Sequence, residues 1–127
     1  MASLTYTVSV QGSQDPVNVT RTPVAAKLTD FAEVVPASTT DFLVNIAIDV
    51  SELEFFILLS DQALTLKTNS TGAPDQTIAI AANVPLTFTG AAGETNPLTV
   101  DITKFYFTNA SATAANVRCV SLQDPTP

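Results

Sequence analysis

The chain has 127 residues, of which 46% are hydrophobic and only 13% charged, and its formal net charge is −7. One domain of this size buries about two thirds of the surface that its unfolded chain exposes, so it needs no disulfide or metal to fold. The charge excludes nucleic acid and anionic membrane surfaces as direct partners, because both require concentrated Lys and Arg. The five basic residues form no run: Arg21, Lys27, Lys67, Lys104 and Arg118.

The N-terminal stretch predicts a pair of short strands. From Leu4 to Val10 apolar residues alternate with Thr and Ser, which predicts a strand, and residues 11–16 predict a turn. Val17 and Val19 predict a second strand, which Pro23 ends or confines to a sheet edge. The first ten residues contain no basic region and no long apolar run, so we expect no signal peptide.

The segment from Ala25 to Val35 leaves two structures open. Leu28, Phe31 and Val34 or Val35 fit a helical spacing, whereas Thr29 and the terminating Pro36 weaken it. We favour an irregular or strand-like crossing segment.

The most apolar part of the chain, residues 41–69, is expected to form the core. Apolar residues at every even position from Phe42 to Val50 predict a half-buried strand. The nearly continuous apolar run from Glu52 to Ser60 is a strand or a short helix, since Ser51 and Glu54 match a capping box. The brevity of the run and its β-rich flanks favour a strand.

Ser60, Asp61 and Gln62 then predict a tight turn, and Leu64, Leu66 and Thr68 predict a third strand. The core is therefore expected to be three successive antiparallel strands.

The second half repeats the pattern of short strands and loops. Two loops, 69–76 and 90–97, are rich in Gly, Pro and small polar residues. Strands are expected around Ile78 and Ile80, over 84–88, over 98–109 and over 117–122.

These elements predict an all-β protein: a single-domain antiparallel β-sandwich or jelly-roll-like barrel of about eight to ten short strands over residues 1–127. Residues 1–10 and 123–127 are expected to form an extended N-terminal arm and a C-terminal tail.

Few residues suggest chemistry. The chain has no histidine, which removes the commonest general base and metal ligand. Cys119 lies in an apolar strand pattern and is interpreted as a structural thiol rather than a nucleophile. We therefore expect a protein that is not an enzyme, with no catalytic, cofactor-binding or metal-binding residues.

Acidic residues cluster around one turn, at Asp49, Glu52 and Glu54. Their spacing matches no Ca²⁺ loop, so a solvated acidic turn is favoured over a cation site. Asp61 and Asp75 are interpreted as turn residues for the same reason.

Aromatic residues are the remaining candidates for a binding site. The run Phe105-Tyr106-Phe107 must place an aromatic on each face of its strand, but the chain lacks Trp, so core filling is favoured over a sugar-stacking platform. The three sequons, at Asn18, Asn69 and Asn109, are expected to remain unglycosylated without a signal peptide.

The Thr- and Ala-rich β pattern, the segment SDQALTLKTNS (60–70) and the ending LQDPTP (122–127) resemble small structural proteins encoded beside the capsid genes of tailed bacteriophages. The resemblance implies a capsid decoration or cement protein that is commonly trimeric. Such a protein is made in the host cytoplasm and binds the major capsid protein on the virion exterior.

The high apolar fraction independently favours a subunit interface. Residues 1–10 and the tail after Leu122 are candidate arms that pair with the sheet edge of a neighbour or with the shell. The alternative function is a carbohydrate-binding or adhesion module of a phage fibre or surface appendage. A cation-dependent hydrolase using the acidic cluster is a third, more distant alternative.

Overall fold

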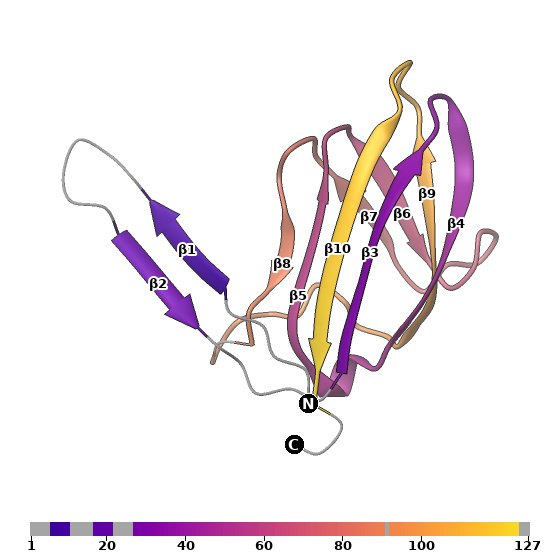
Figure 1. Cartoon of the computed structure of the whole chain (residues 1–127). Helices are drawn as coiled ribbons and strands as arrows, with labels where there is room; N and C mark the ends of the chain where they lie inside the picture. Colours follow the sequence, from indigo (N-terminus) through magenta and orange to yellow (C-terminus); the bar gives the residue numbers. More distant parts are fainter. Residues whose placement is uncertain (1–5, 11–16, 22–26, 91, 125–127) are drawn as a thin grey trace.

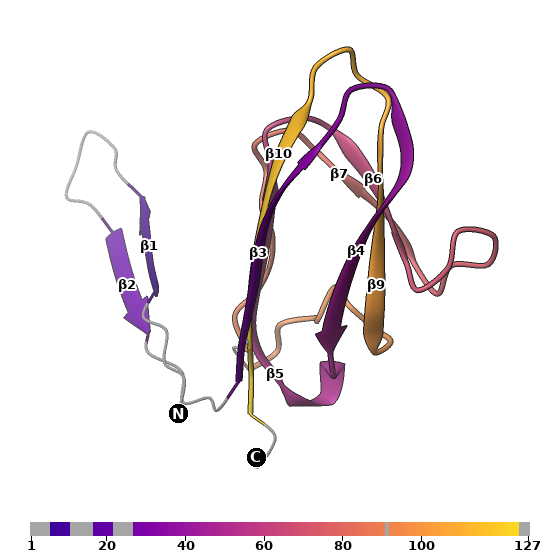
Figure 2. The same cartoon turned by 45° about the vertical axis from the view of Figure 1, so that its right-hand side comes forward.

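A computed structural model of the chain describes residues 6–10, 17–21, 27–90 and 92–124, the first two ranges by their backbone alone. Eight antiparallel strands form two packed four-stranded sheets, and a two-stranded hairpin precedes them (Figures 1 and 2). The all-β prediction is confirmed, and of the two architectures expected from the sequence the chain adopts the β-sandwich.

The strand order explains how the two layers form. The first sheet has the order β3-β10-β5-β8 and the second the order β4-β9-β6-β7. The first sheet contains β3 (Lys27–Val35), β10 (Ala115–Gln123), β5 (Leu53–Ser60) and β8 (Leu86–Phe88). The second contains β4 (Thr39–Ile48), β9 (Ile102–Asn109), β6 (Leu64–Thr68) and β7 (Thr77–Ile80). The hairpin is β1 (Tyr6–Val10) with β2 (Val17–Arg21).

The ambiguous segment before Pro36 is a strand. β3 pairs with β10 along its whole length, from Lys27 opposite Gln123 to Val35 opposite Ala115. The strand-like interpretation of this segment is confirmed. Pairing with β10 along nine residues satisfies backbone N–H and C=O groups that the two ends of a short helix would leave without partners.

The central segment forms three strands, as expected, but consecutive strands lie in different sheets. β4 pairs with β9, β5 pairs with β10 and β8, and β6 pairs with β9 and β7. The three strands follow one another in the chain without being neighbours in a sheet. The strand interpretation of residues 52–60 is confirmed, and in place of a capping box at Ser51 the structure has a single 3-10 turn, η1 (Val50–Glu52), capped by Asp49.

Hydrogen bonds hold η1 as the corner between the sheets. The buried carboxamide of Gln123, on β10, accepts from the Asp49 backbone N–H at 2.8 Å and donates to the Ala47 carbonyl at 3.3 Å. The Asp101 carboxylate accepts from the Val50 N–H at 3.0 Å. These bonds join the first sheet to the end of β4 and fix where the chain changes layer.

Aromatic rings fill the space between the layers. Phe31 and Phe56 of the first sheet meet Phe105 and Phe107 of β9, with ring centroids 5.9–6.5 Å apart for the contacting pairs. Edge and tilted contacts at these distances are the favoured geometry for aromatic pairs. Phe56, Phe105 and Phe107 are completely buried, so this cluster is the centre of the core.

The strand expected over 98–109 begins later than predicted. Residues 98–101 form an irregular connection in which Leu98 is buried and Val100 is 41% exposed, and β9 starts at Ile102. The Asn69 carboxamide explains the difference: it accepts from the Thr103 N–H at 2.7 Å and donates to the Asp101 carbonyl at 2.8 Å. At this point the backbone on both sides of Ile102 is therefore bonded by the Asn69 side chain and not by a neighbouring strand.

Gly90 provides a test of how the loop after β8 packs. Its φ is +75°, and a Cβ atom there would lie 2.8 Å from the backbone oxygen of Glu54, closer than real contacts allow. We expect Gly90→Ala to lower the free energy of unfolding by about 1–3 kcal/mol, measured by urea denaturation. Gly72→Ala is the matched control, because a Cβ at Gly72 meets nothing within 4 Å. Equal stability of the two variants would contradict this packing.

Candidate functional site

The outer surface of the first sheet is unusually apolar for an antiparallel sandwich. Strand pairing places the odd residues of β5 and the even residues of β3 and β10 on this side. We call the apolar members the outer apolar face: Leu28, Ala32, Val34, Phe55, Ile57, Leu59, Val120 and Leu122. The polar positions among them are Asp30, Thr87, Asn116 and Arg118. One face of an antiparallel sheet is normally polar, and here both faces are apolar.

Exposure changes along the outer apolar face. Val34 is 54% exposed, Leu28 45% and Leu59 39%, which are high values for large apolar side chains. Phe55 and Leu122, which pair across β5 and β10, are 6% and 0% exposed although neither belongs to the core cluster between the sheets. The face is therefore covered by the chain itself at Phe55 and Leu122, whereas Val34 and Leu59 are open, and so is Leu28, which pairs with Leu122 at the edge strand.

The second sheet shows the usual pattern and serves as an internal comparison. Its outer positions are mainly Thr, Lys and Asn, with Tyr106 half buried among them. Lys67 and Asp41 form an ion pair of 3.4 Å on this surface. Leu43, at 45% exposure, is its one large exposed aliphatic residue among those described. The apolar surface is thus a property of the first sheet and not of the whole sandwich.

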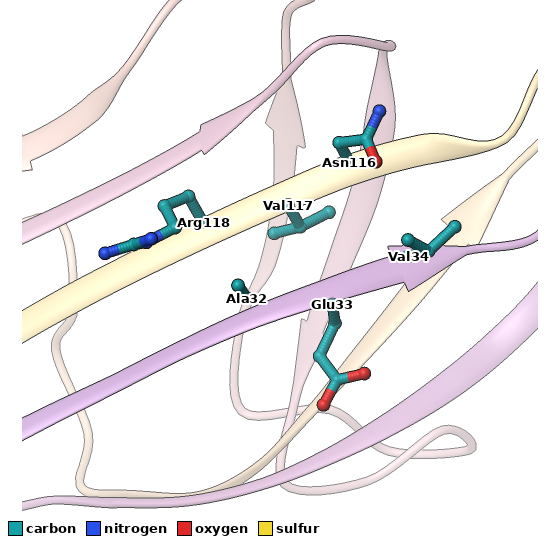
Figure 3. A pocket seen from close by; sticks show the side chains of 6 residues that line it. All are labelled: Ala32, Glu33, Val34, Asn116, Val117 and Arg118. Carbon is teal, nitrogen blue, oxygen red and sulfur yellow. The ribbon is translucent and has the colours of Figure 1, made fainter.

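A shallow hollow lies between β3 and β10, over the small side chain of Ala32 (Figure 3). Arg118 and Glu33 extend to opposite sides of the sheet, in agreement with the pairing of Arg118 with Ala32. Val34 is the large apolar side chain at its outer rim, while Val117, also in its lining, belongs to the core between the sheets. The hollow is shallow and open, so it does not enclose a small ligand as a binding pocket would.

The acidic cluster expected near the first corner is not brought together as a ligand set. Asp49 accepts from both the N–H and the hydroxyl of Ser51, at 3.0 and 2.6 Å, and these bonds lower the pKa of its carboxyl group. In the described part of the chain, no three Asp, Glu or Cys side chains converge as a metal site would require. Asp49 acts as a capping residue, which is the turn role favoured for this cluster.

Asp61 and Asp75 also have turn roles. The Asp61 carboxylate accepts from the Asn116 N–H at 2.8 Å and from its side-chain amide at 2.7 Å, which lowers the pKa of Asp61. Asp75 accepts from the Asn69 amide at 2.7 Å. Asp61 fastens its turn to β10, and Asp75 joins the two ends of the loop that follows β6, so both have the turn roles that the sequence predicted.

The aromatic run on β9 divides between the two sides of its sheet. Phe105 and Phe107 are completely buried in the core, and Tyr106 lies half buried on the outer side. Core filling is confirmed for the two Phe residues, and a single ring outside makes no stacking platform.

Two of the three sequon asparagines have engaged side chains. The buried amide of Asn109 donates to the carbonyls of Val35, Pro36 and Thr113, at 2.9–3.3 Å. Asn69 bonds Asp75, Asp101 and Thr103. Asn18 lies on β2, whose side chains are outside the described part.

Comparisons of the chain with protein-family models, with curated proteins and with solved structures gave no match. Among the residues that the structure describes, no helix has the length and hydropathy needed to cross a membrane.

Cys119 lies on the inner face of β10 and is completely buried. Burial, with a smaller contribution from Asp30, raises the pKa of its thiol to about 12. A raised pKa keeps the thiol neutral throughout the range below that value, and the neutral thiol is a poor nucleophile. We expect a maleimide or disulfide reagent to leave Cys119 unmodified at pH 8 in the folded protein and to modify it fully in guanidinium chloride. Rapid modification under native conditions would contradict the placement of Cys119.

Proposed function

We propose that this protein is a capsid decoration, or cement, protein: a non-enzymatic structural protein that binds and stabilises the exterior of a phage capsid as a homo-oligomer, with a trimer favoured. Its partner is the major capsid protein of the shell, and its place is the virion surface. The observation that carries the proposal is the outer apolar face of the first sheet, with Val34, Leu28 and Leu59 open to solvent.

An exposed apolar sheet face supports an assembly role for a physical reason. Burying apolar area is worth about 25 cal/mol per Å² and is the main driving force of permanent association. The net charge of −7 makes copies of the chain repel one another, which opposes non-specific aggregation through the apolar face. The β-sandwich fold and the resemblance of residues 60–70 and 122–127 to phage structural proteins agree with this role.

Co-sedimentation with empty shells tests this function. The shells should be assembled from the major capsid protein encoded in the same genome, and shell stability should be followed by thermal melting. We expect saturable pelleting at a fixed ratio to the capsid subunit and a higher melting temperature of the decorated shells. An unrelated acidic β-sandwich protein of similar charge controls for trapping. If the protein stays in the supernatant at saturating concentration, the proposed function is wrong.

A further inference from the structure

We propose that β3 of one copy pairs antiparallel with β3 of a second copy, about a two-fold axis at Phe31, so that the two first sheets become one continuous sheet. The contact joins copies of this chain and does not need a shell, so it goes beyond the proposed function. A two-fold contact closes a dimer by itself, and it joins two trimers where a three-fold contact is also present.

β3 is the longest regular edge strand of the described sandwich. One side of it pairs with β10 through an unbroken register of nine residues, and no strand in the described part of the chain pairs with its other side. The other edge strands are short or irregular: β8 has three residues, β7 has four, and the register of β4 shifts twice. Short length, bulges and proline are the usual protection of a sheet edge against a second chain. β3 has none of them, so its backbone is available for pairing.

Exposure within the outer apolar face is highest on β3. Leu28 is 45% exposed and Val34 is 54% exposed, and both lie on the outer side of this strand. Leu122, which pairs with Leu28 from the neighbouring β10, is completely buried. The open apolar side chains thus follow the free edge, where a further strand in the same sheet would cover them.

The alternation of side chains selects the register of the pair. Residues directly opposite each other in an antiparallel ladder point to the same side of the sheet, so the two outer apolar faces join only if even residues oppose even residues. With Phe31 opposite Phe31, all nine residues pair, and Leu28 of each copy lies opposite Val34 of the other. Moving the axis to Asp30 or Ala32 shortens the ladder to residues 27–33 or 29–35. An axis at Asp30 also places two carboxylates directly opposite each other, which is destabilising.

Opposite charges meet across this register on the inner side of the strand. Glu33 of one copy lies opposite Thr29 and diagonal to Lys27 of the other. Diagonal neighbours are within reach of long side chains. Because the axis is two-fold, the contact contains two such pairs of Lys27 with Glu33.

Arg118 balances the acidic residue on the outer side. In its own sheet Arg118 pairs with Ala32 and is therefore diagonal to Asp30 of the same chain. Across the axis Ala32 lies opposite Asp30 of the second copy, so this carboxylate is two strands from Arg118, about 10 Å between Cα atoms. The side chain between them is small, and the hollow over Ala32 leaves room for the guanidinium to extend across it (Figure 3). Two Arg118 and two Asp30 side chains then alternate around the axis, and no carboxylate is left without a cation.

This match favours a second copy over a strand of another protein as the occupant. An identical strand supplies the partner for Leu28, for Val34, for Lys27 and for Glu33 in a single register. A strand from another protein would need the same alternation of apolar and charged residues to give the same contact.

Crosslinking of introduced cysteines tests the pairing. In the proposed register Leu28 and Val34 of different copies are about 5 Å apart between Cβ atoms, whereas within one chain these residues are six apart, or about 20 Å. The Leu28→Cys/Val34→Cys double variant, treated with a short bis-maleimide, should therefore give a covalent dimer. Each single variant should stay a single chain, because its two cysteines lie far from each other across the axis. Cys119 is buried, with a thiol pKa of about 12, so its lack of modification reports that each variant is folded.

The Leu28→Cys/Leu59→Cys variant is the matched control. Leu59 lies on the same outer face and is 39% exposed, but β5 is separated from the free edge of β3 by β10. We expect no covalent dimer from this variant.

Three results would overturn the inference. The first is a folded Leu28→Cys/Val34→Cys protein that gives no covalent dimer. The second is a covalent dimer of Leu28→Cys alone, which would mean that the strands pair in parallel or in another register. The third is a dimer formed as readily by the control, which would mean that the sheets stack face to face. Co-sedimentation of the unmodified protein with shells is measured separately, so each of these results leaves the test of the proposed function intact.

Discussion

The aromatic cluster of Phe31, Phe56, Phe105 and Phe107 determines which way the strands of the first sheet face. Side chains alternate along a strand, so placing Phe31 and Phe56 inward forces Ala32, Phe55 and Ile57 outward. A slip of one residue would move these rings to the surface, which the contacts of Phe105 with both of them prevent. The core thus fixes the composition of the outer apolar face.

This constraint connects packing to function. β5 carries apolar residues on both sides, because Phe56 and Leu58 fill the core while Ile57 and Leu59 face outward. Strands with apolar residues on both sides are typical of sheets that are covered on both faces, and exposing the outer apolar side chains to water costs free energy. The second sheet has no such conflict, since Thr65, Lys67 and Thr108 face the solvent. The part of this face around Val34 and Leu59 stays open to solvent in the single chain, and this is the observation on which the proposed assembly role rests.

Much of the fold could be predicted from the sequence. Period-two patterns identified the strands at Tyr6–Val10 and Leu64–Thr68. The strand expected over Phe42–Val50 is β4 as far as Ile48, and Val50 belongs instead to η1. The change of sheet between β4 and β5 could not be predicted, because the bonds that hold the Asp49 corner come from Gln123 and Asp101, in distant parts of the chain. The late start of β9 has the same kind of cause in Asn69.

The candidate site was harder to predict, although one signal was present. The unbroken apolar run from Phe55 to Leu59 is typical of a strand that is covered on both sides, but the sequence analysis used it only to favour a strand over a helix and predicted no apolar outer face. The residues that β3 adds to the outer apolar face could not be recognised, because Leu28 and Val34 fit the spacing of a helix as well as that of a strand. Only the pairing of β3 with β10 places them beside Val120 and Leu122.

The solution mass of the purified protein, measured by light scattering after size exclusion over a wide concentration range, tests most directly whether the outer apolar face is an association surface. The account predicts a stable closed oligomer, with a trimer favoured, whose mass does not change on dilution. A protein that remains a monomer at every concentration, with its outer apolar face open to solvent, would contradict it.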